Sequence, residues 1–203
     1  MNNNIKLIKR LNSNCKKRFL VIGVFHGDEF QGEYFINSYL KNAINSTPIK
    51  NEVFYIPRLN SSSTRKNPNG VDLNRNFPTK NWVLGENNDY FGGNEANSEI
   101  ETQFMVELID NYNFDGIITI HSPYKVINYD GPAEKFALQV QKYVNYPITS
   151  DIGYPTPGSF GTYCGVERKI PTLTIEIDET EDIEKLNKDF SCLFNFLENE
   201  YWF

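Results

Sequence analysis

The sequence lacks any long hydrophobic segment. None of its 203 residues lies in an apolar run of 18 or more, so we predict no membrane-spanning helix. The first residues, MNNNIKLIKRLNSNCKKRF, are basic but include no continuous apolar region and no clear cleavage site. We therefore do not expect a secretory signal. Because internal repeats and low-complexity linkers are also missing, we expect residues 1–203 to form a single domain in the cytoplasm, without membrane contact.

Cysteine is scarce as well, and acidic residues outnumber basic ones. The three cysteines, Cys15, Cys164 and Cys192, are odd in number and form no C-x-x-C motif. That usage is typical of a reducing compartment rather than of a disulfide-stabilised fold. The net charge of −6 argues against nucleic acid as a partner, because such proteins present a basic surface. It does not exclude a small basic pocket.

The apolar segments that are present alternate between short β-type runs and longer helical patterns. This alternation favours an α/β fold with one mixed, largely parallel sheet and helices on both faces. The predicted strands cover residues 19–25, 53–56, 116–121 and 172–177. The predicted helices cover about 29–41, 98–109, 133–146 and 183–197. The irregular stretch 59–97 is too long for an idle connection, so we expect it to be functional.

Two of the predicted helices have recognisable starts. Ser98 and Glu101 fit a capping box before the second helix, in which each side chain would bond a free backbone N–H. Glu181 and Asp182 suit the positive N-terminal end of the last helix.

Histidine is also rare, and both copies follow apolar strands. His26 comes after VIGVF and precedes Glu29 by three residues, whereas His121 closes GIITIH. Ligands bind at strand ends in open α/β sheets. Two imidazoles and a carboxylate, with no thiolate cluster, are typical of a catalytic zinc site. Either histidine alone would more simply be a core or loop residue, but both together with Glu29 predict one Zn²⁺ per chain.

A carboxylate interrupts the apolar run TLTIEID, at Glu176. Burying a carboxylate is costly unless it is paired or used. Glu176 could simply face solvent from an edge strand. Beside a metal ion it is instead the best candidate for a general base that takes a proton from water and delivers it to a leaving amine.

Two arginines bracket the turn Asn-Pro-Asn-Gly. Arg65 and Arg75 lie in RKNPNGVDLNRNFP. Close together in an acidic protein, they could bind a carboxylate in bidentate fashion and polarise a carbonyl group. The alternative is a pair of ordinary surface arginines.

Four short motifs follow one another along the chain: HGDE at 26–29, Arg65 with GVDLNRNFP, IHSP at 120–123 and TIEI at 174–177. Together they resemble the zinc carboxypeptidase family, which includes the pancreatic carboxypeptidases. The match runs from about residue 21 to 177. It implies a single zinc carboxypeptidase-like catalytic domain.

The resemblance also assigns roles. It implies that His26, Glu29 and His121 hold zinc and that Glu176 is the catalytic glutamate. The carbonyl-polarising arginine of the family matches Arg65. The pair that holds the terminal carboxylate of the substrate matches Asn74 and Arg75.

A narrower resemblance lies in DIGYPTPGSFGTYCG, residues 151–165. This segment is similar to a loop of the bacterial murein peptide amidases, small cytosolic members of the family that cut the γ-D-glutamyl–diaminopimelate bond of cell-wall peptides. The resemblance implies a murein tripeptide as substrate, contacted by Tyr154, Ser159 and Tyr163. The glycines and prolines of the segment could otherwise serve only as turn residues.

Two other functions remain open from the sequence. An N-acyl amino acid deacylase of the aspartoacylase or succinylglutamate desuccinylase type would share the zinc ligands and the Asp-Leu-Asn-Arg stretch. A non-catalytic binder of wall peptides would have lost a ligand or the base, whereas all are present here. Dimers among relatives raise the further expectation of a homodimer, and neither meso-diaminopimelate nor lysine is preferred as the released residue.

Overall fold

The apolar runs of the sequence come together as one mixed sheet. In the computed structural model, which describes residues 5–43 and 48–200, seven strands pair in the order β1-β3-β2-β4-β7-β5-β6. The strands are β1 (Ile8–Arg10), β2 (Arg18–Ile22), β3 (Glu52–Ile56), β4 (Gly116–His121), β5 (Val126–Asp130), β6 (Ile148–Thr149) and β7 (Thr172–Glu176). Only the β1–β3 and β5–β7 pairs are antiparallel within the described residues. The predicted mixed, largely parallel sheet is confirmed.

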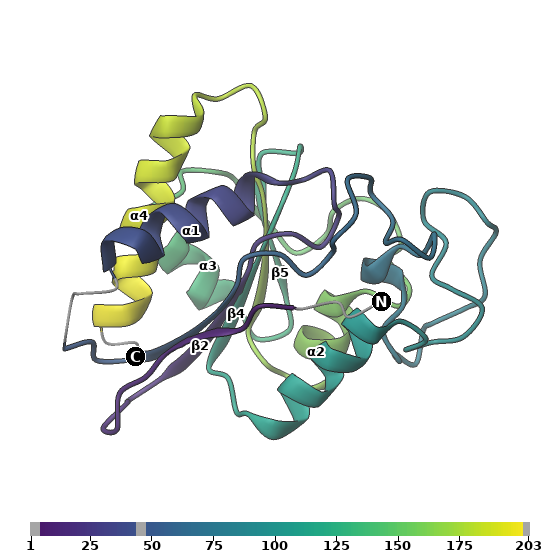
Figure 1. Cartoon of the computed structure of the whole chain (residues 1–203), viewed down its shortest axis with the longest axis horizontal. Helices are drawn as coiled ribbons and strands as arrows, with labels where there is room; N and C mark the ends of the chain where they lie inside the picture. Colours follow the sequence, from purple (N-terminus) through teal and green to yellow (C-terminus); the bar gives the residue numbers. More distant parts are fainter. Residues whose placement is uncertain (1–4, 44–47, 201–203) are drawn as a thin grey trace.

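Helices cover both faces of this sheet, as predicted. They are α1 (Gln31–Ala43), α2 (Ile100–Asn111), α3 (Glu134–Val140) and α4 (Ile183–Asn199), with a short 3-10 helix η1 (Leu73–Arg75) and a π-helix η2 (Thr162–Glu167). α1, α3 and α4 lie on one side of the sheet and α2 on the other (Figure 1). No helix in the described ranges is long and apolar enough to cross a membrane.

Each face of the sheet has its own apolar core. One core joins the sheet to α1, α3 and α4, where Phe35 and Phe190 stack with ring centroids 4.7 Å apart. The other joins the sheet to α2 and η2 and includes Phe25, Met105 and Tyr163. Each fully buried large apolar side chain contributes about 1.5–3 kcal/mol to folding. The sheet is therefore held rigidly from both sides, which fixes its strand ends.

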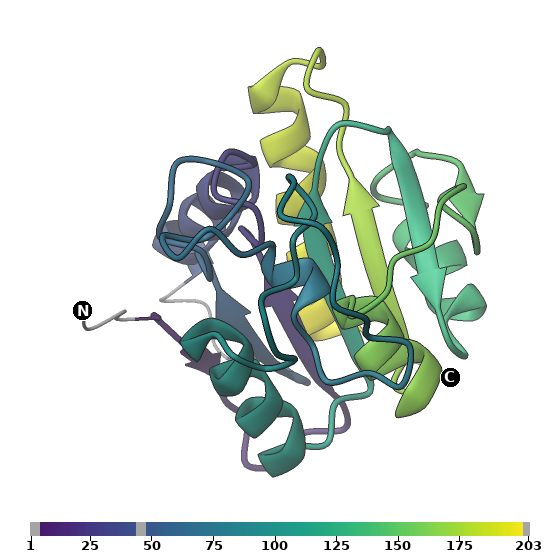
Figure 2. The same cartoon turned by 90° about the vertical axis from the view of Figure 1, so that its right-hand side faces the viewer.

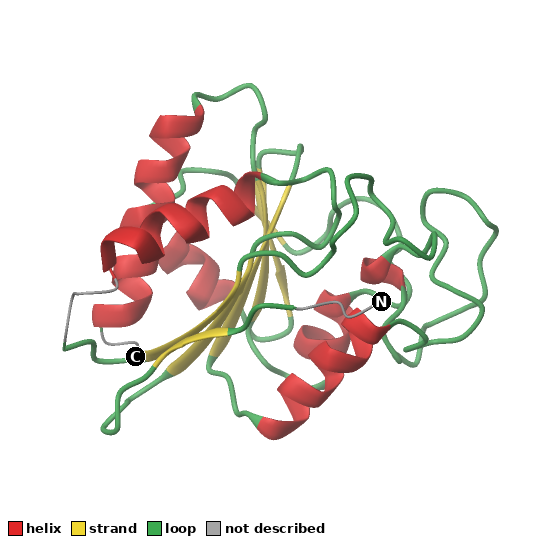
Figure 3. Cartoon of the chain, viewed as in Figure 1, coloured by secondary structure: helices red, strands yellow, loops and turns green. Residues whose placement is uncertain are grey.

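Glycines let β2 and α1 approach closely at the point where the chain leaves the sheet. A Cβ atom on Gly32 would lie 2.1 Å from the carbonyl oxygen of Gly23, so only glycine fits there. The short link between them carries His26 and Glu29. Figure 3 shows the long loops gathered to one side of the sheet, and Figure 2 shows them crossing in front of it.

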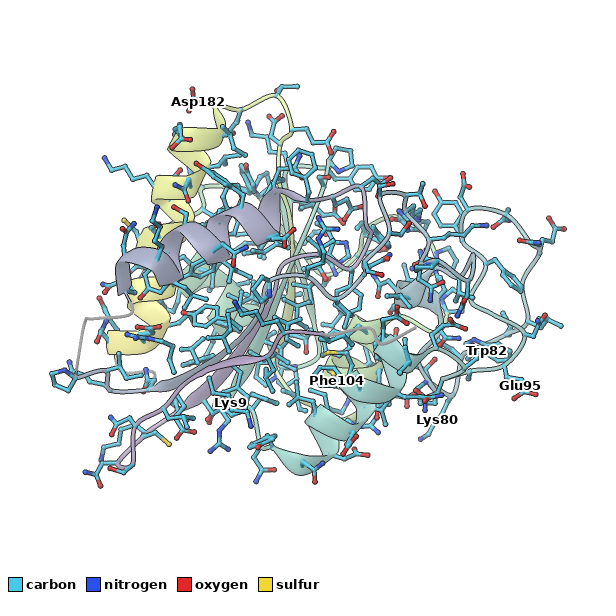
Figure 4. All side chains as sticks on the ribbon, in the orientation of Figure 1. Lys9, Lys80, Trp82, Glu95, Phe104 and Asp182 are labelled. Carbon is cyan, nitrogen blue, oxygen red and sulfur yellow. The ribbon has the colours of Figure 1, made fainter. Side chains whose placement is uncertain are left out.

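The helix predicted over 133–146 is shorter than expected. α3 ends at Val140, and turns follow it. The last helix is confirmed, and Asp182 caps it by accepting hydrogen bonds from the N–H groups of Glu184 and Lys185 at 2.9 Å each. Figure 4 shows Asp182 at the start of α4.

The capping box predicted at Ser98 is wrong. Glu99 occupies the cap position of α2 and makes no side-chain cap bond. The Ser98 hydroxyl donates to Glu99 Oε1 at 2.8 Å and accepts from the Asn76 amide at 3.0 Å. The side chain of Ser98 therefore bonds within the long loop before α2 instead of capping the helix.

Candidate functional site

Three parallel strands in the middle of the sheet bring the rare functional side chains to one edge. β4 lies between β2 and β7, and His121 is directly opposite Glu176. His26 follows β2, and a turn in which the Glu29 N–H donates to the His26 carbonyl oxygen at 3.1 Å returns the chain toward it. Side chains from residues far apart in sequence thus meet where parallel strands end, as expected of α/β sheets.

His26, Glu29 and His121 point their ligand atoms at one place. The atoms of the three lie within 4.8 Å of one another. Glu29 Oε1 is 2.7 Å from His26 Nδ1, and Glu29 Oε2 is 2.9 Å from His121 Nδ1. The two Nδ1 atoms are 3.3 Å apart. Ligand nitrogens of a tetrahedral zinc ion are separated by about that distance, because Zn–N bonds are about 2.0–2.1 Å. The donor set and its spacing fit zinc.

Asp72 holds His26 from behind. Its Oδ1 atom is 3.2 Å from His26 Nε2, and the carboxyl group is fully buried. Burial opposes a charge on His26, but the hydrogen bonds to Asp72 and Glu29 outweigh it and raise the histidine pKa to about 9. The carboxylates therefore favour a positive charge at this point. A divalent cation would supply that charge and displace the proton.

Glu176 is buried beside the metal-ligand group. Its side chain lies on β7, which has neighbours on both sides, so the alternative of a solvated edge-strand carboxylate is wrong. Burial, reinforced by the charge of Glu29, raises the pKa of Glu176 to about 8. Its Oε2 atom has no hydrogen-bond partner within the described ranges. A buried, unpartnered carboxyl oxygen beside a cavity is a typical feature of a proton-transferring group.

The two arginines meet the same cavity but differ in their partners. Arg65 donates twice to Asp72 Oδ2, at 3.2 and 3.0 Å. Arg75 is 6% exposed, donates to the Asn74 carbonyl oxygen at 2.8 Å, and has no carboxylate within salt-bridge distance in the described part of the chain. The Tyr90 ring lies 4.9 Å from the Arg65 guanidinium and 5.6 Å from that of Arg75. Within the described residues no carboxylate neutralises Arg75, so its guanidinium can pair with an anionic ligand.

Asn74 has one end of its amide group occupied. Its Oδ1 atom accepts from the Phe160 N–H at 2.9 Å. The bond engages the oxygen and leaves the NH₂ as the donor of this side chain, and Asn74 lines the cavity described below. An NH₂ donor beside Arg75 suits a carboxylate.

One cavity of about 270 Å³ connects most of these side chains. Its lining includes the predicted site residues His26, Glu29, Arg65, Asn74, Arg75, His121, Tyr154, Ser159 and Glu176. Tyr154 is 39% exposed at this cavity. The Ser159 hydroxyl donates to Thr162 Oγ1 at 2.9 Å and accepts from the Thr162 N–H at 3.1 Å, which leaves one lone pair of its oxygen for a ligand.

Tyr163 is not brought to the cavity. The π-helix η2 turns its ring into the core, with the centroid 5.5 Å from that of Phe77. Its hydroxyl accepts from Arg168 Nη2 at 2.6 Å. The prediction that Tyr163 contacts substrate is therefore contradicted by its position, because no part of the side chain lines the cavity.

Sequence reasoning missed several residues of the site. Asp72 stands two residues before Asn74 in the GVDLNRN motif, and that closeness was the available signal. Tyr90 lies in an irregular polar segment without periodicity, so nothing in the sequence marks it. Asn128 and Asp130 of β5 also line the cavity, although that strand was not predicted.

The sequence profile of the zinc carboxypeptidase family matches residues 2–142. The protein is 29% identical over 200 residues to "Murein peptide amidase A" of Vibrio campbellii, across 90% of this chain and 78% of the relative.

Solved structures give a matching result. The murein-tripeptide amidase of Escherichia coli O157 superposes with a TM-score of 0.78 at 25% identity, covering 93% of this chain and 83% of that one. The carboxypeptidase A of Helicoverpa armigera shares the fold, with a TM-score of 0.70 at 16% identity over 94% of this chain and 64% of that one. The protein is a hydrolase, and it belongs to the zinc carboxypeptidase family.

Proposed function

We propose that this protein is a zinc-dependent amidase that hydrolyses the γ-D-glutamyl–meso-diaminopimelate bond of murein peptides. Relatives that match most of the chain are murein peptide amidases. The observation that carries the proposal is the position of Arg75, a buried guanidinium without a carboxylate partner among the described residues, in the same cavity as His26, Glu29 and His121. A peptide whose terminal carboxylate bound Arg75 would extend its amide bond toward those three ligands.

His26, Glu29 and His121 are the proposed zinc ligands, one ion per chain. When bound, zinc supplies a Lewis acid that polarises a carbonyl oxygen and lowers the pKa of water. The positive charge of such an ion would lower the pKa of Glu176, against the effect of burial, and so favour its ionised form. Asp72 fixes the ring of His26, so the ligand set is oriented before metal or substrate arrives.

Glu176 is the proposed general base. Its free Oε2 atom accepts a proton from the attacking water and passes it to the amine that leaves. Arg65, held by Asp72, donates to the oxyanion that develops on the substrate carbonyl. Asn74 and Arg75 hold the terminal carboxylate, which converts binding far from the reacting bond into orientation. Tyr154 and Ser159 are the proposed contacts from the 151–165 loop.

The proposal is tested by product analysis. The protein, loaded with zinc, is incubated with L-Ala-γ-D-Glu-meso-diaminopimelate, N-acetyl-aspartate or N-succinyl-glutamate, and products are identified by mass spectrometry. A chelator-treated sample is the control. We expect free diaminopimelate, formed only with metal present. Cleavage of an acyl amino acid instead would assign the protein to the deacylases, and silence on all three with zinc bound would favour a wall-peptide binder.

A further inference from the structure

The cavity extends beyond the residues of the proposed chemistry, along β5. Asn128 lies opposite Thr174 on β7, and Asp130 lies opposite Thr172. Residues two apart on a strand, and residues opposite each other on paired strands, share a face of the sheet. Asn128 and Asp130 are therefore on the face that carries Glu176, and both line the cavity.

These two side chains offer acceptors without matching donors. Asp130 has no salt-bridge partner in the described part of the chain, and its carboxyl group accepts a 3.3 Å hydrogen bond from the Asn128 amide. The Asn128 Oδ1 atom is buried and has no hydrogen-bond partner there. Burial alone raises the pKa of Asp130 to about 6. Unsatisfied buried acceptors cost folding free energy, so they call for a functional explanation.

The backbone around Asp130 is arranged to leave room for its carboxyl group. A Cβ atom on Gly161 would lie 2.2 Å from Asp130 Oδ2, and one on Gly165 would lie 2.4 Å from Asp130 Cβ. η2 and the residue that precedes it thus pack directly against the end of β5 through glycines. A side chain at Gly161 would clash with the carboxylate of Asp130, and one at Gly165 would clash with its Cβ atom and backbone.

The distance to the reaction centre suits one amino acid with a long side chain. Val126 is opposite Glu176, and Asp130 is four residues further along β5, or ~13 Å at about 3.3 Å per residue. The side chains of Glu176 and Asp130 stand on the same face of the sheet at the two ends of that span. The cavity therefore combines a cationic Arg75 with an unneutralised carboxylate at a separate place on its wall.

We propose that Asp130 and Asn128 bind the ammonium group at the end of the side chain of the residue that the enzyme releases. This inference rests on the proposed amidase function, and it deepens it by assigning the residues that recognise the side chain of the released amino acid. An ammonium group has three donors and no acceptor, which matches two carboxylate oxygens and the free Asn128 oxygen. Lysine and diaminopimelate both carry such a group, whereas an apolar side chain would leave the acceptors unsatisfied.

The test compares three peptides, L-Ala-γ-D-Glu-X, in which X is meso-diaminopimelate, lysine or norleucine. Norleucine has the length of lysine without its ammonium group. We expect kcat/KM of the wild type to be about 100-fold or more higher for lysine than for norleucine, because a site with buried polar groups rejects a ligand that cannot pair with them.

The Asp130→Asn variant should lower kcat/KM for the lysine peptide and raise it for the norleucine peptide. Two changes of opposite sign cannot arise from misfolding. Asn128→Leu, which removes the free acceptor, should shift the ratio in the same direction by a smaller factor. Asp110→Asn is the matched control, because Asp110 lies on α2 with a 60% exposed side chain.

Each outcome has a distinct meaning. A wild type that cleaves the diaminopimelate peptide but shows no preference for the lysine peptide over the norleucine peptide would overturn the ammonium site and leave the amidase function standing. The ammonium site would equally be overturned if Asp130→Asn kept the lysine preference. Failure to cleave any of the peptides, with zinc bound, would overturn the amidase function itself.

Discussion

The Nε2 atom of His26 lies 3.2 Å from Oδ1 of Asp72, while the other oxygen of that carboxylate accepts two hydrogen bonds from Arg65. One buried carboxylate thus fixes both a proposed zinc ligand and the proposed oxyanion donor. Asp72 also accepts from the Asn74 N–H at 2.9 Å, which caps η1. Asp72 therefore connects the proposed metal ligands to Asn74 and Arg75, the residues proposed to bind the substrate carboxylate.

The first prediction concerns this carboxylate. Asp72→Asn should weaken zinc binding by about 10–100-fold, because partners behind a ligand histidine orient the ring and raise its basicity. Asparagine keeps an oxygen for the η1 cap, so the fold should persist. Zinc affinity is measured by competition with a chromogenic chelator. An affinity equal to that of the wild type would show that the His26–Asp72 contact does not support the metal.

The second prediction separates proton transfer from metal binding. Glu176→Gln should retain one zinc ion per chain and lose activity by about 10²–10⁴-fold, the usual range for a positioned acid–base group. Metal content is measured by atomic absorption and turnover by release of diaminopimelate. If the glutamine variant kept near-normal turnover, Glu176 would not be the base.

The third prediction concerns the aromatic ring beside the arginines. Tyr90→Leu should raise KM for the peptide by about 2–5-fold, since a cation–π contact at an exposed site is worth about 0.5–1 kcal/mol. Tyr90→Phe keeps the ring and serves as the matched control. Steady-state kinetics on both variants checks this. Equal KM values for the Tyr90→Leu and Tyr90→Phe variants would show that the ring does not position Arg65 or Arg75.

The fourth prediction is a pH dependence of stability. The pKa of Asp130 is raised to about 6 in the folded protein by burial, so the folded state binds more protons than the unfolded state between about pH 4 and 6. Its contribution to the free energy of unfolding therefore falls as pH rises through that window. Above it, the ionised carboxylate costs up to about 3 kcal/mol.

Asp130→Asn removes that cost. The metal-free variant should be more stable than the metal-free wild type at pH 8, and the difference should vanish near pH 4. Urea unfolding at both pH values measures it, with Asp110→Asn as the exposed control. A difference of the same size at both values would trace the effect to packing instead of charge.

The central strands could be predicted from sequence because β2, β4 and β7 are largely buried and read as continuous apolar runs. β5 could not, because Asn128 and Asp130 face the polar cavity and break the apolar pattern of VINYD. Because His26 and His121 each follow one of these recognisable strands, the sequence also predicted that the two histidines lie near each other.

The rest of the site depends on contacts that local sequence does not encode. Tyr90 reaches the arginines from an irregular loop, which has no periodicity to interpret. Tyr163 was misplaced because its direction is decided by η2 and by its contacts with Phe77 and Arg168. The 151–165 loop was recognisable from its sequence, but which of its side chains face the cavity depends on tertiary contacts.

The carbonyl group of Arg75 sits between two glycines from distant loops. A Cβ atom would approach its oxygen to 2.3 Å from Gly92 and to 2.2 Å from Gly158. Both loops therefore pack closely against the same backbone atom, and changes in length are tolerated best in the exposed parts of the loops away from these glycines. Insertions there could reshape the rim of the cavity over evolutionary time without moving the arginine beneath it.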